Sequence, residues 1–184
     1  MEAFHWIVVP ISTVLGLTVA RVLLGFVGTF KARAQVTFYW LPVVLAGAVV
    51  GEGLQFWWAM FELSGRAGWS LFSFTLLLSM IMSLFAAGAL IAPADGDRDM
   101  VTAFERDGRW AMVCLGLFHV LAIPANAVLW EVPLASATEA LQVLLALLCF
   151  TSTFARNRRW QEVLAVTYVA VSVIDTFAAS VMSY

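Results

Sequence analysis

The chain has 184 residues, of which 62% are hydrophobic and 12% are charged, and its mean hydropathy is +0.93. A soluble domain of this length does not carry so apolar a surface, so the composition predicts an integral membrane protein embedded in a lipid bilayer. The net charge is −2, and the cationic residues are spread over short connections. This excludes nucleic acid as a partner.

Six apolar segments follow one another along the chain. They cover residues 6–30, 36–62, 69–92, 110–130, 134–155 and 160–182. Each is close to the ~20 residues that a helix needs to cross ~30 Å of hydrocarbon. Because the connections are short, successive segments are expected to pack as antiparallel pairs. The sequence therefore predicts an all-α polytopic membrane protein, with six transmembrane helices arranged as three hairpins in one domain, 1–184.

Basic residues are concentrated in alternate connections. Eight of the ten lysines and arginines lie in the first, third and fifth connections, and the other connections hold Arg66 alone. Because short loops rich in Lys and Arg stay cytoplasmic, the hairpin tips are predicted to be cytoplasmic and both termini to lie outside. In a bacterium this is an inner-membrane protein with periplasmic termini. The eight tryptophans lie near segment ends, as is typical of residues at the membrane interface.

The third connection, residues 94–109, is charged, and its Asp95, Asp97 and Asp99 resemble the start of a calcium loop. The spacing does not fit, because glycine stands second rather than sixth and Arg106 occupies the twelfth position in place of glutamate. We expect a solvated charged turn here that leads into an amphipathic extension of the fourth helix, and no metal site is predicted anywhere in the chain.

The second segment carries Glu52 near its middle, with Gln55 one turn further on. A charged residue at the bilayer centre costs roughly 2.5 to 3.5 kcal/mol on insertion scales, so Glu52 needs a partner or a water-filled cavity. The same segment has Gly47 and Gly51 at GxxxG spacing. These glycines predict a surface where another helix packs closely.

Arg21, in the first segment, is the predicted partner of Glu52. The two residues differ in depth, but side chains tilt toward the N-terminus of their own helix, so on antiparallel helices these two lean toward each other. A buried ion pair is the favoured interpretation, since arginine suits a carboxylate with several hydrogen bonds. In the alternative, Arg21 extends to the cytoplasmic surface and leaves Glu52 in a cavity.

Polar residues also mark the other segments. They are Ser79 and Ser83 on the third, His119 and Asn126 on the fourth, Glu139, Gln142, Cys149 and Thr153 on the fifth, and Ser172, Asp175 and Thr176 on the sixth. Counting the helical rise places His119 near the depth of Arg21, and Asn126 and Asp175 near that of Glu52. We expect a polar layer across the bundle, although serines can bond their own helix and a single His or Asn can act only in helix association.

Cofactor signatures are few. No lysine lies within a segment, which excludes a retinal Schiff base, and there is no CxxCH for attached haem and no nucleotide-binding glycine pattern. His5 and His119 differ too much in depth to hold one haem. Cys114 and Cys149 are expected to be small buried hydrophobic residues rather than a disulfide or a metal site. The sequence does not identify a cofactor.

Three functional hypotheses follow. The leading one is a channel or transporter for an ion, a proton or a small polar solute, which works as a homo-oligomer. Its route would be lined by Arg21, Glu52, Gln55, His119, Asn126 and Asp175, with Ser79 and Ser83 nearby. The second is a non-catalytic membrane subunit or assembly factor that docks a membrane protein partner. The third is an intramembrane enzyme or quinone-binding protein that uses His119 and a carboxylate.

Overall fold

The structure, a computed structural model, describes residues 2–66, 68–94, 99–155 and 157–182, with side chains from residue 4 to residue 176. These residues form six α-helices, which confirms the predicted all-α class. The helices are α1 (Glu2–Lys31), α2 (Trp40–Glu62), α3 (Leu71–Ile91), α4 (Met100–Leu129), α5 (Ala137–Phe154) and α6 (Arg158–Met182). A short 3-10 turn, η1 (Leu63–Gly65), follows α2.

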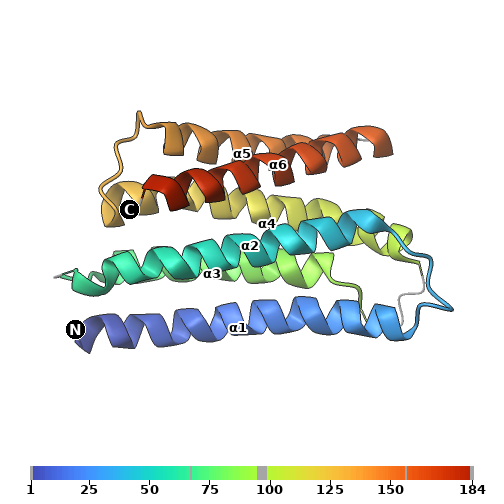
Figure 1. Cartoon of the computed structure of the whole chain (residues 1–184), viewed down its shortest axis with the longest axis horizontal. Helices are drawn as coiled ribbons and strands as arrows, with labels where there is room; N and C mark the ends of the chain where they lie inside the picture. Colours follow the sequence, from blue (N-terminus) through green and yellow to red (C-terminus); the bar gives the residue numbers. More distant parts are fainter. Residues whose placement is uncertain (1, 67, 95–98, 156, 183–184) are drawn as a thin grey trace.

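Successive helices run in opposite directions, so that α1 begins and α6 ends at the same end of the bundle (Figure 1). We call this the terminal end. The connections α1–α2, α3–α4 and α5–α6 lie at the opposite end, which we call the basic end. The predicted arrangement in three hairpins therefore matches the path of the chain. Which end faces the cytoplasm stays a prediction.

Five helices are long and apolar enough to cross a membrane. They are the spans Phe4–Lys31, Trp40–Gly65, Leu71–Ile91, Met100–Leu129 and Ala137–Phe154. By helix length and hydropathy the chain is therefore an integral membrane protein. The described part of α6 is not among these five; its first turns carry Arg158, Arg159 and Glu162. A sixth crossing stays a prediction.

Helix α4 begins at Met100, ten residues before the predicted start of its apolar segment. Asp99 is the N-cap: its carboxylate accepts hydrogen bonds from Thr102 Oγ1 at 2.6 Å and from the Val101 N–H at 3.0 Å. These bonds hold the pKa of Asp99 below its usual range. Asp99 thus starts a helix. Asp95, Asp97 and Arg98 lie outside the described residues, as does Arg156 of the fifth connection, while residues 100–109 form the predicted extension of the fourth helix.

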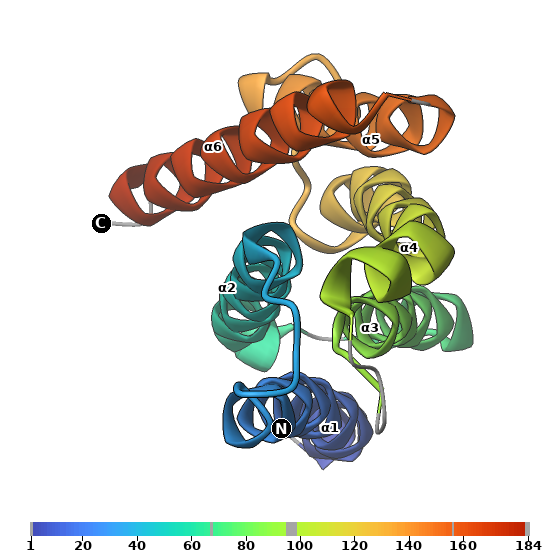
Figure 2. The same cartoon turned by 90° about the vertical axis from the view of Figure 1, so that its right-hand side faces the viewer.

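Helix α2 occupies a central position. In the view along the bundle, α1 lies below α2 and α3, and α4, α5 and α6 lie above them (Figure 2). Helix α2 packs against α1 and α3 on one side and against α6 and α4 on the other. Further contacts join α1 to α3, α3 to α4, α4 to α5 and α5 to α6. Two faces of α2 therefore meet different halves of the molecule.

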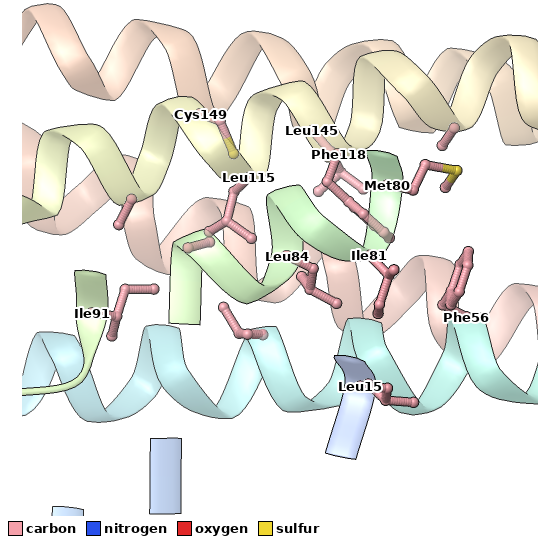
Figure 3. Packing of buried hydrophobic residues seen from close by; sticks show 14 of the residues in the cluster. Leu15, Phe56, Met80, Ile81, Leu84, Ile91, Leu115, Phe118, Leu145 and Cys149 are labelled. Carbon is pink, nitrogen blue, oxygen red and sulfur yellow. The ribbon is translucent and has the colours of Figure 1, made fainter. Parts of the chain in front are cut away.

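Apolar side chains fill the interior where α1, α2 and α3 meet, and the core continues to α4 and α5 (Figure 3). Several glycines allow close approach, among them Gly53 and Gly88. A Cβ atom on Gly53 would lie 2.6 Å from Leu15 Cδ1, and one on Gly88 would lie 3.1 Å from Val22 Cγ2. In contrast, nothing lies within 4 Å of a Cβ atom on Gly47 or Gly51. No described helix of this chain packs on these two glycines, so the predicted packing surface stays a prediction for a helix from outside the chain.

Polar contacts join the two halves of the molecule at both ends. At the terminal end, the Arg66 guanidinium donates to the carbonyls of Leu129 at 2.8 Å and Val128 at 3.0 Å, where a cation suits the C-terminus of α4. At the basic end, Tyr39 donates to Glu162 at 3.1 Å, and burial raises the pKa of this tyrosine. These contacts hold α2 and its neighbours in register around the interior.

Candidate functional site: a buried polar cluster

Six buried polar side chains meet between α2, α4, α5 and α6, and we call them the polar cluster. They are Glu52, His119, Gln142, Tyr168, Ser172 and Asp175, and each is at most 8% exposed. Burying unpaired polar groups costs several kcal/mol in an apolar medium, so such a cluster persists only if its members bond one another.

Glu52 lies on the face of α2 that meets α6. Ser172 Oγ donates to Glu52 Oε1 at 2.6 Å, and the Tyr168 hydroxyl lies 3.5 Å from the same oxygen. His119 Nε2 is 3.9 Å away. Successive residues on a helix are rotated by about 100°, so the neighbouring Gly53 faces α1 while Glu52 faces α6. The carboxyl group therefore sits among neutral donors and an imidazole.

His119 bridges two sides of the cluster. Its Nδ1 lies 2.8 Å from Gln142 Oε1, and its Nε2 lies 3.1 Å from the Tyr168 hydroxyl. Gln142 Nε2 donates to Asp175 Oδ2 at 3.1 Å. Because that bond uses the amide N–H, the amide oxygen faces His119 and can only accept. Neutral His119 is thus protonated on Nδ1, and its Nε2 is free to accept from Tyr168.

Helix α6 supplies half of the cluster from one face. Tyr168, Ser172 and Asp175 are four and three residues apart, spacings that place side chains on the same side of a helix. Thr176 follows on this face and donates to Gln55 Oε1 at 2.8 Å. This bond extends the polar contact between α2 and α6 by one turn, toward the terminal end.

A further acid, Glu139, lies beside the cluster in the first turn of α5. Its side chain is buried, and neither carboxylate oxygen has a hydrogen-bond partner among the described residues. The Asn126 amide and the Asp175 carboxyl lie near enough to interact with it. Residues 136–139 read SATE, the pattern of a capping box. Only half of the box forms, because the Ser136 hydroxyl accepts from the Glu139 N–H at 3.2 Å while the Ser136 N–H donates to Pro133.

A cavity of about 210 Å³ opens at the basic end between α4, α5 and α6. Its polar lining includes Glu105, Arg109, Ser152 and Gln161, and its apolar lining includes Leu45, Met112 and Ala165. Ala165 is three residues from Tyr168, about 4.5 Å along the helix axis. The cavity therefore ends about one helical turn from the polar cluster.

The buried thiol of Cys149 lies between the cavity and the cluster. It interacts with Glu52 and Tyr168. One turn further on, Ser152 lines the cavity, and its hydroxyl donates to the Cys149 carbonyl at 2.7 Å. Both Cys149 and Cys114 are free cysteines, which rules out the disulfide alternative in this structure. Cys149 is fully buried and Cys114 partly so.

Comparison with protein-family models, with curated proteins and with solved structures finds no match to this chain. The site is interpreted from its own residues.

Four of the predicted site residues come together: Glu52, Gln55, His119 and Asp175. His119 lies at the depth of Glu52, so the prediction that it shares the depth of Arg21 is wrong. A count of helical rise from segment ends misplaced it because α4 starts well before its apolar segment. Another predicted site residue, Asn126, lies beside Glu139 instead.

The predicted pair between Arg21 and Glu52 is wrong. The Arg21 guanidinium lies 3.4 Å from the Ala92 carbonyl oxygen and 3.5 Å from that of Pro93, at the end of α3 nearest the basic end. The C-terminus of a helix attracts a cation, and these carbonyls are acceptors that α3 itself leaves free. Glu52 faces α6, out of reach of α1. The structure agrees with the alternative only in that Arg21 extends away from Glu52: the carboxyl group is bonded to Ser172 and Tyr168 and lines neither cavity described for the structure.

The serines of α3 do not join the polar cluster. Ser83 is buried, but its hydroxyl donates to the Met80 carbonyl of its own helix at 2.7 Å. Ser79 is half-buried on the same helix. Helix α3 packs against α1, α2 and α4, and its interior face is apolar. The Ser83 hydroxyl is therefore satisfied within its own helix and needs no partner in the polar cluster.

Sequence reasoning missed Tyr168, the residue that connects Glu52 to His119. Its signal was the spacing it shares with Ser172 and Asp175 on α6. Gln142 was noticed only as part of a polar stripe. Among the described residues, no group of three or more His, Cys, Asp or Glu side chains could hold a metal ion. The chemistry that the site offers is hydrogen bonding and proton exchange.

Proposed function

We propose that this membrane protein moves protons through the polar cluster, alone or together with a small solute. The observation that carries this proposal is the hydrogen-bonded sequence Glu52, Tyr168 and His119 in the interior of the bundle. A carboxyl group, a phenol and an imidazole can each give up and take up a proton. Intramembrane acids and histidines of this kind mark proton relays in transporters.

Two protonation states satisfy the same geometry. In the first, Glu52 carries the proton, and the Tyr168 hydroxyl donates to the neutral Nε2 of His119. In the second, His119 is cationic and donates from Nε2 to the Tyr168 oxygen, while the Tyr168 hydroxyl donates to the Glu52 carboxylate. One proton leaves Glu52 and one arrives at His119, so the phenol only passes it on. Ser172 donates to Glu52 in both states.

Gln142 and Asp175 have a positioning role in this proposal. An amide does not pass a proton on in its ordinary tautomer, so the relay ends at His119 on this side. Gln142 holds the imidazole by its Nδ1–H, and the negative charge of Asp175 behind it favours the cationic state of His119. This arrangement parallels the way an outer carboxylate orients a histidine in many sites.

The cavity at the basic end would connect the relay to water. Its lining residue Ala165 lies one turn from Tyr168, and the Cys149 thiol is close enough to interact electrostatically with Tyr168 and Glu52. Water entering the region between Ala165 and Tyr168 would connect the cavity to Glu52. Loss of this water would break the connection. We therefore expect Cys149 to react with thiol reagents more slowly than Cys114, and at a rate that depends on the state of the relay.

Flux in proteoliposomes tests the proposal. With a potassium diffusion potential as driving force and a pH-sensitive dye inside, the wild type should acidify the lumen faster than empty vesicles. Glu52→Gln and His119→Ala should lower this rate roughly 100-fold. Glu62→Gln, which changes an exposed acid on the same helix, should leave it unchanged. A wild type that moves no protons, or Glu52→Gln with full flux, contradicts the proposal.

A second candidate function is favoured by the open face of Gly47 and Gly51. The two glycines lie one turn apart with free space above them, where a backbone from outside the chain could pack. We propose a homo-oligomer here, with a different membrane protein as the alternative occupant if the chain is a subunit of a larger complex. Gly47→Cys should then form a cross-linked dimer in membranes. A hetero-partner that purifies with the chain, together with no proton flux, would favour the subunit hypothesis.

A further inference from the structure

Glu139 is a buried acid that the proposed relay does not use. It is 2% exposed, and neither carboxylate oxygen forms a hydrogen bond of full geometry with a described residue, although the Asn126 amide interacts with it. Every other acid in this interior is satisfied: Glu52 by Ser172 and Tyr168, and Asp175 by Gln142. A carboxylate with this burial and only an amide near it is destabilising unless something else binds it.

The surroundings of Glu139 are negative or neutral. Asp175, on α6, is close enough to interact with it electrostatically, and the Asn126 amide, on α4, interacts with it directly. Further off, Asp175 interacts with Glu52 from α2 and with His119 from α4. Neither Glu139 nor Asp175 has a lysine or arginine partner among the described residues. Two neighbouring carboxylates in a low-dielectric interior do not both stay ionised without a cation or a proton.

We propose that Glu139, with Asp175 and Asn126, forms a binding site for one monovalent cation, a proton or a sodium ion. Carboxylate and amide oxygens are hard ligands that suit both. Glu139 stands in the first turn of α5, and Asn126 in the last turn of α4, so the site lies toward the terminal end. The half-formed capping box supports this, because a capping glutamate has turned into the bundle. Binding requires no transport, so the site stands even if the proton relay fails.

A cation in this site would act on the relay through Asp175. Neutralising Asp175 removes the negative charge behind Gln142 that favours cationic His119. Loading at the terminal end would therefore release a proton from His119, and unloading would restore its affinity. The coupling rests on the proposed function, while the binding itself does not.

The first test is thermal unfolding of the detergent-purified full chain over a range of pH. It compares sodium chloride with choline chloride at equal ionic strength. The second test is infrared spectroscopy of the carboxyl groups in the same samples. If sodium binds, it raises the melting temperature of the wild type by roughly 3 °C, and the effect shrinks as protons compete at lower pH. If only a proton binds, sodium has no specific effect, but a protonated carboxyl band disappears as the pH is raised.

In either case Glu139→Gln removes the signal, and Glu105→Gln, which changes an exposed acid at the basic end, keeps it. Asp175→Asn serves as the second variant if Glu139→Gln does not fold, and it should weaken the signal. A wild type with neither a sodium-specific shift nor a titrating carboxyl band overturns the proposal. So does a signal that persists unchanged in Glu139→Gln.

Discussion

The two faces of α2 meet interiors of opposite character. Toward α1 and α3 the contacts are apolar and close: Leu15 lies against Gly53, and Val22 against Gly88. Toward α6 and α4 the interior is polar, with Glu52 at its centre. Both halves are buried, and both are built from helices of similar length. They differ in whether the buried groups need a hydrogen-bond partner.

This difference separates scaffold from site. Apolar packing between helices depends on shape, so the first half should respond to changes of volume. A hydrogen-bonded cluster depends on donors and acceptors, so the second half should respond to isosteric changes that alter only polarity. Since Gly53 and Glu52 are neighbours, one helix carries both requirements. The predictions below separate the two.

The largest effect on stability is expected from a bulky residue in the apolar half. In Gly88→Leu even the Cβ atom would lie 3.1 Å from Val22 Cγ2 and 3.3 Å from Thr18 and Val49, all on packed helices. We expect the free energy of unfolding to fall by about 3 kcal/mol, or folding to fail. Gly16→Leu is the control, because nothing lies within 4 Å of a Cβ atom there. Thermal unfolding in detergent compares them, and equal melting temperatures would show that the apolar half is not tightly packed.

A smaller effect is expected from removing an amide in the polar half. Gln142→Leu keeps the volume but leaves the His119 Nδ1–H and the Asp175 carboxyl without their shared partner. We expect a loss of about 2 kcal/mol, since both groups remain buried. Gln35→Leu, in the exposed α1–α2 connection, should change stability little. If Gln142→Leu is as stable as the wild type in detergent unfolding, the cluster is not held by these bonds.

The smallest effect concerns Asp99, outside the membrane-spanning part of α4. Its pKa is lowered in the folded state by the Thr102 hydroxyl and the Val101 N–H, so its contribution to stability is present above the unfolded pKa and is lost as the pH falls through the folded value. Asp99→Asn keeps a cap but does not titrate. Wild type and Asp99→Asn should thus diverge only in acid, as followed by circular dichroism. Parallel curves would show that the Asp99 carboxylate does not stabilise the start of α4.

The helices were predictable because length and hydropathy alone decide them. The burial of Glu52 was predictable as well, since its position in an apolar segment leaves few alternatives. Its partner was not, because rise along a helix gives depth but not the neighbour a side chain faces. Arg21 shares the hairpin with Glu52, yet the fold turns Glu52 toward α6, which comes last in the chain.

The same limit explains the glycines and Tyr168. Gly47 and Gly51 carry a GxxxG pattern, but Gly53 and Gly88 make the close contacts, because packing depends on which face the bundle buries. Tyr168 stands among valines and resembles a lipid-facing or core aromatic. Only the fold, which places α6 beside α2 and α4, gives its hydroxyl two partners, Glu52 and His119.

Proton flux through Tyr168→Phe tests the central claim most directly. The substitution removes one oxygen atom, the one that lies 3.1 Å from His119 Nε2 and 3.5 Å from Glu52 Oε1, and leaves the ring in place. In proteoliposomes we expect a loss of roughly 100-fold in proton flux. The control Tyr39→Phe, which removes a hydroxyl at the basic end, should keep the wild-type rate. A folded Tyr168→Phe protein that conducts protons like the wild type would contradict the relay.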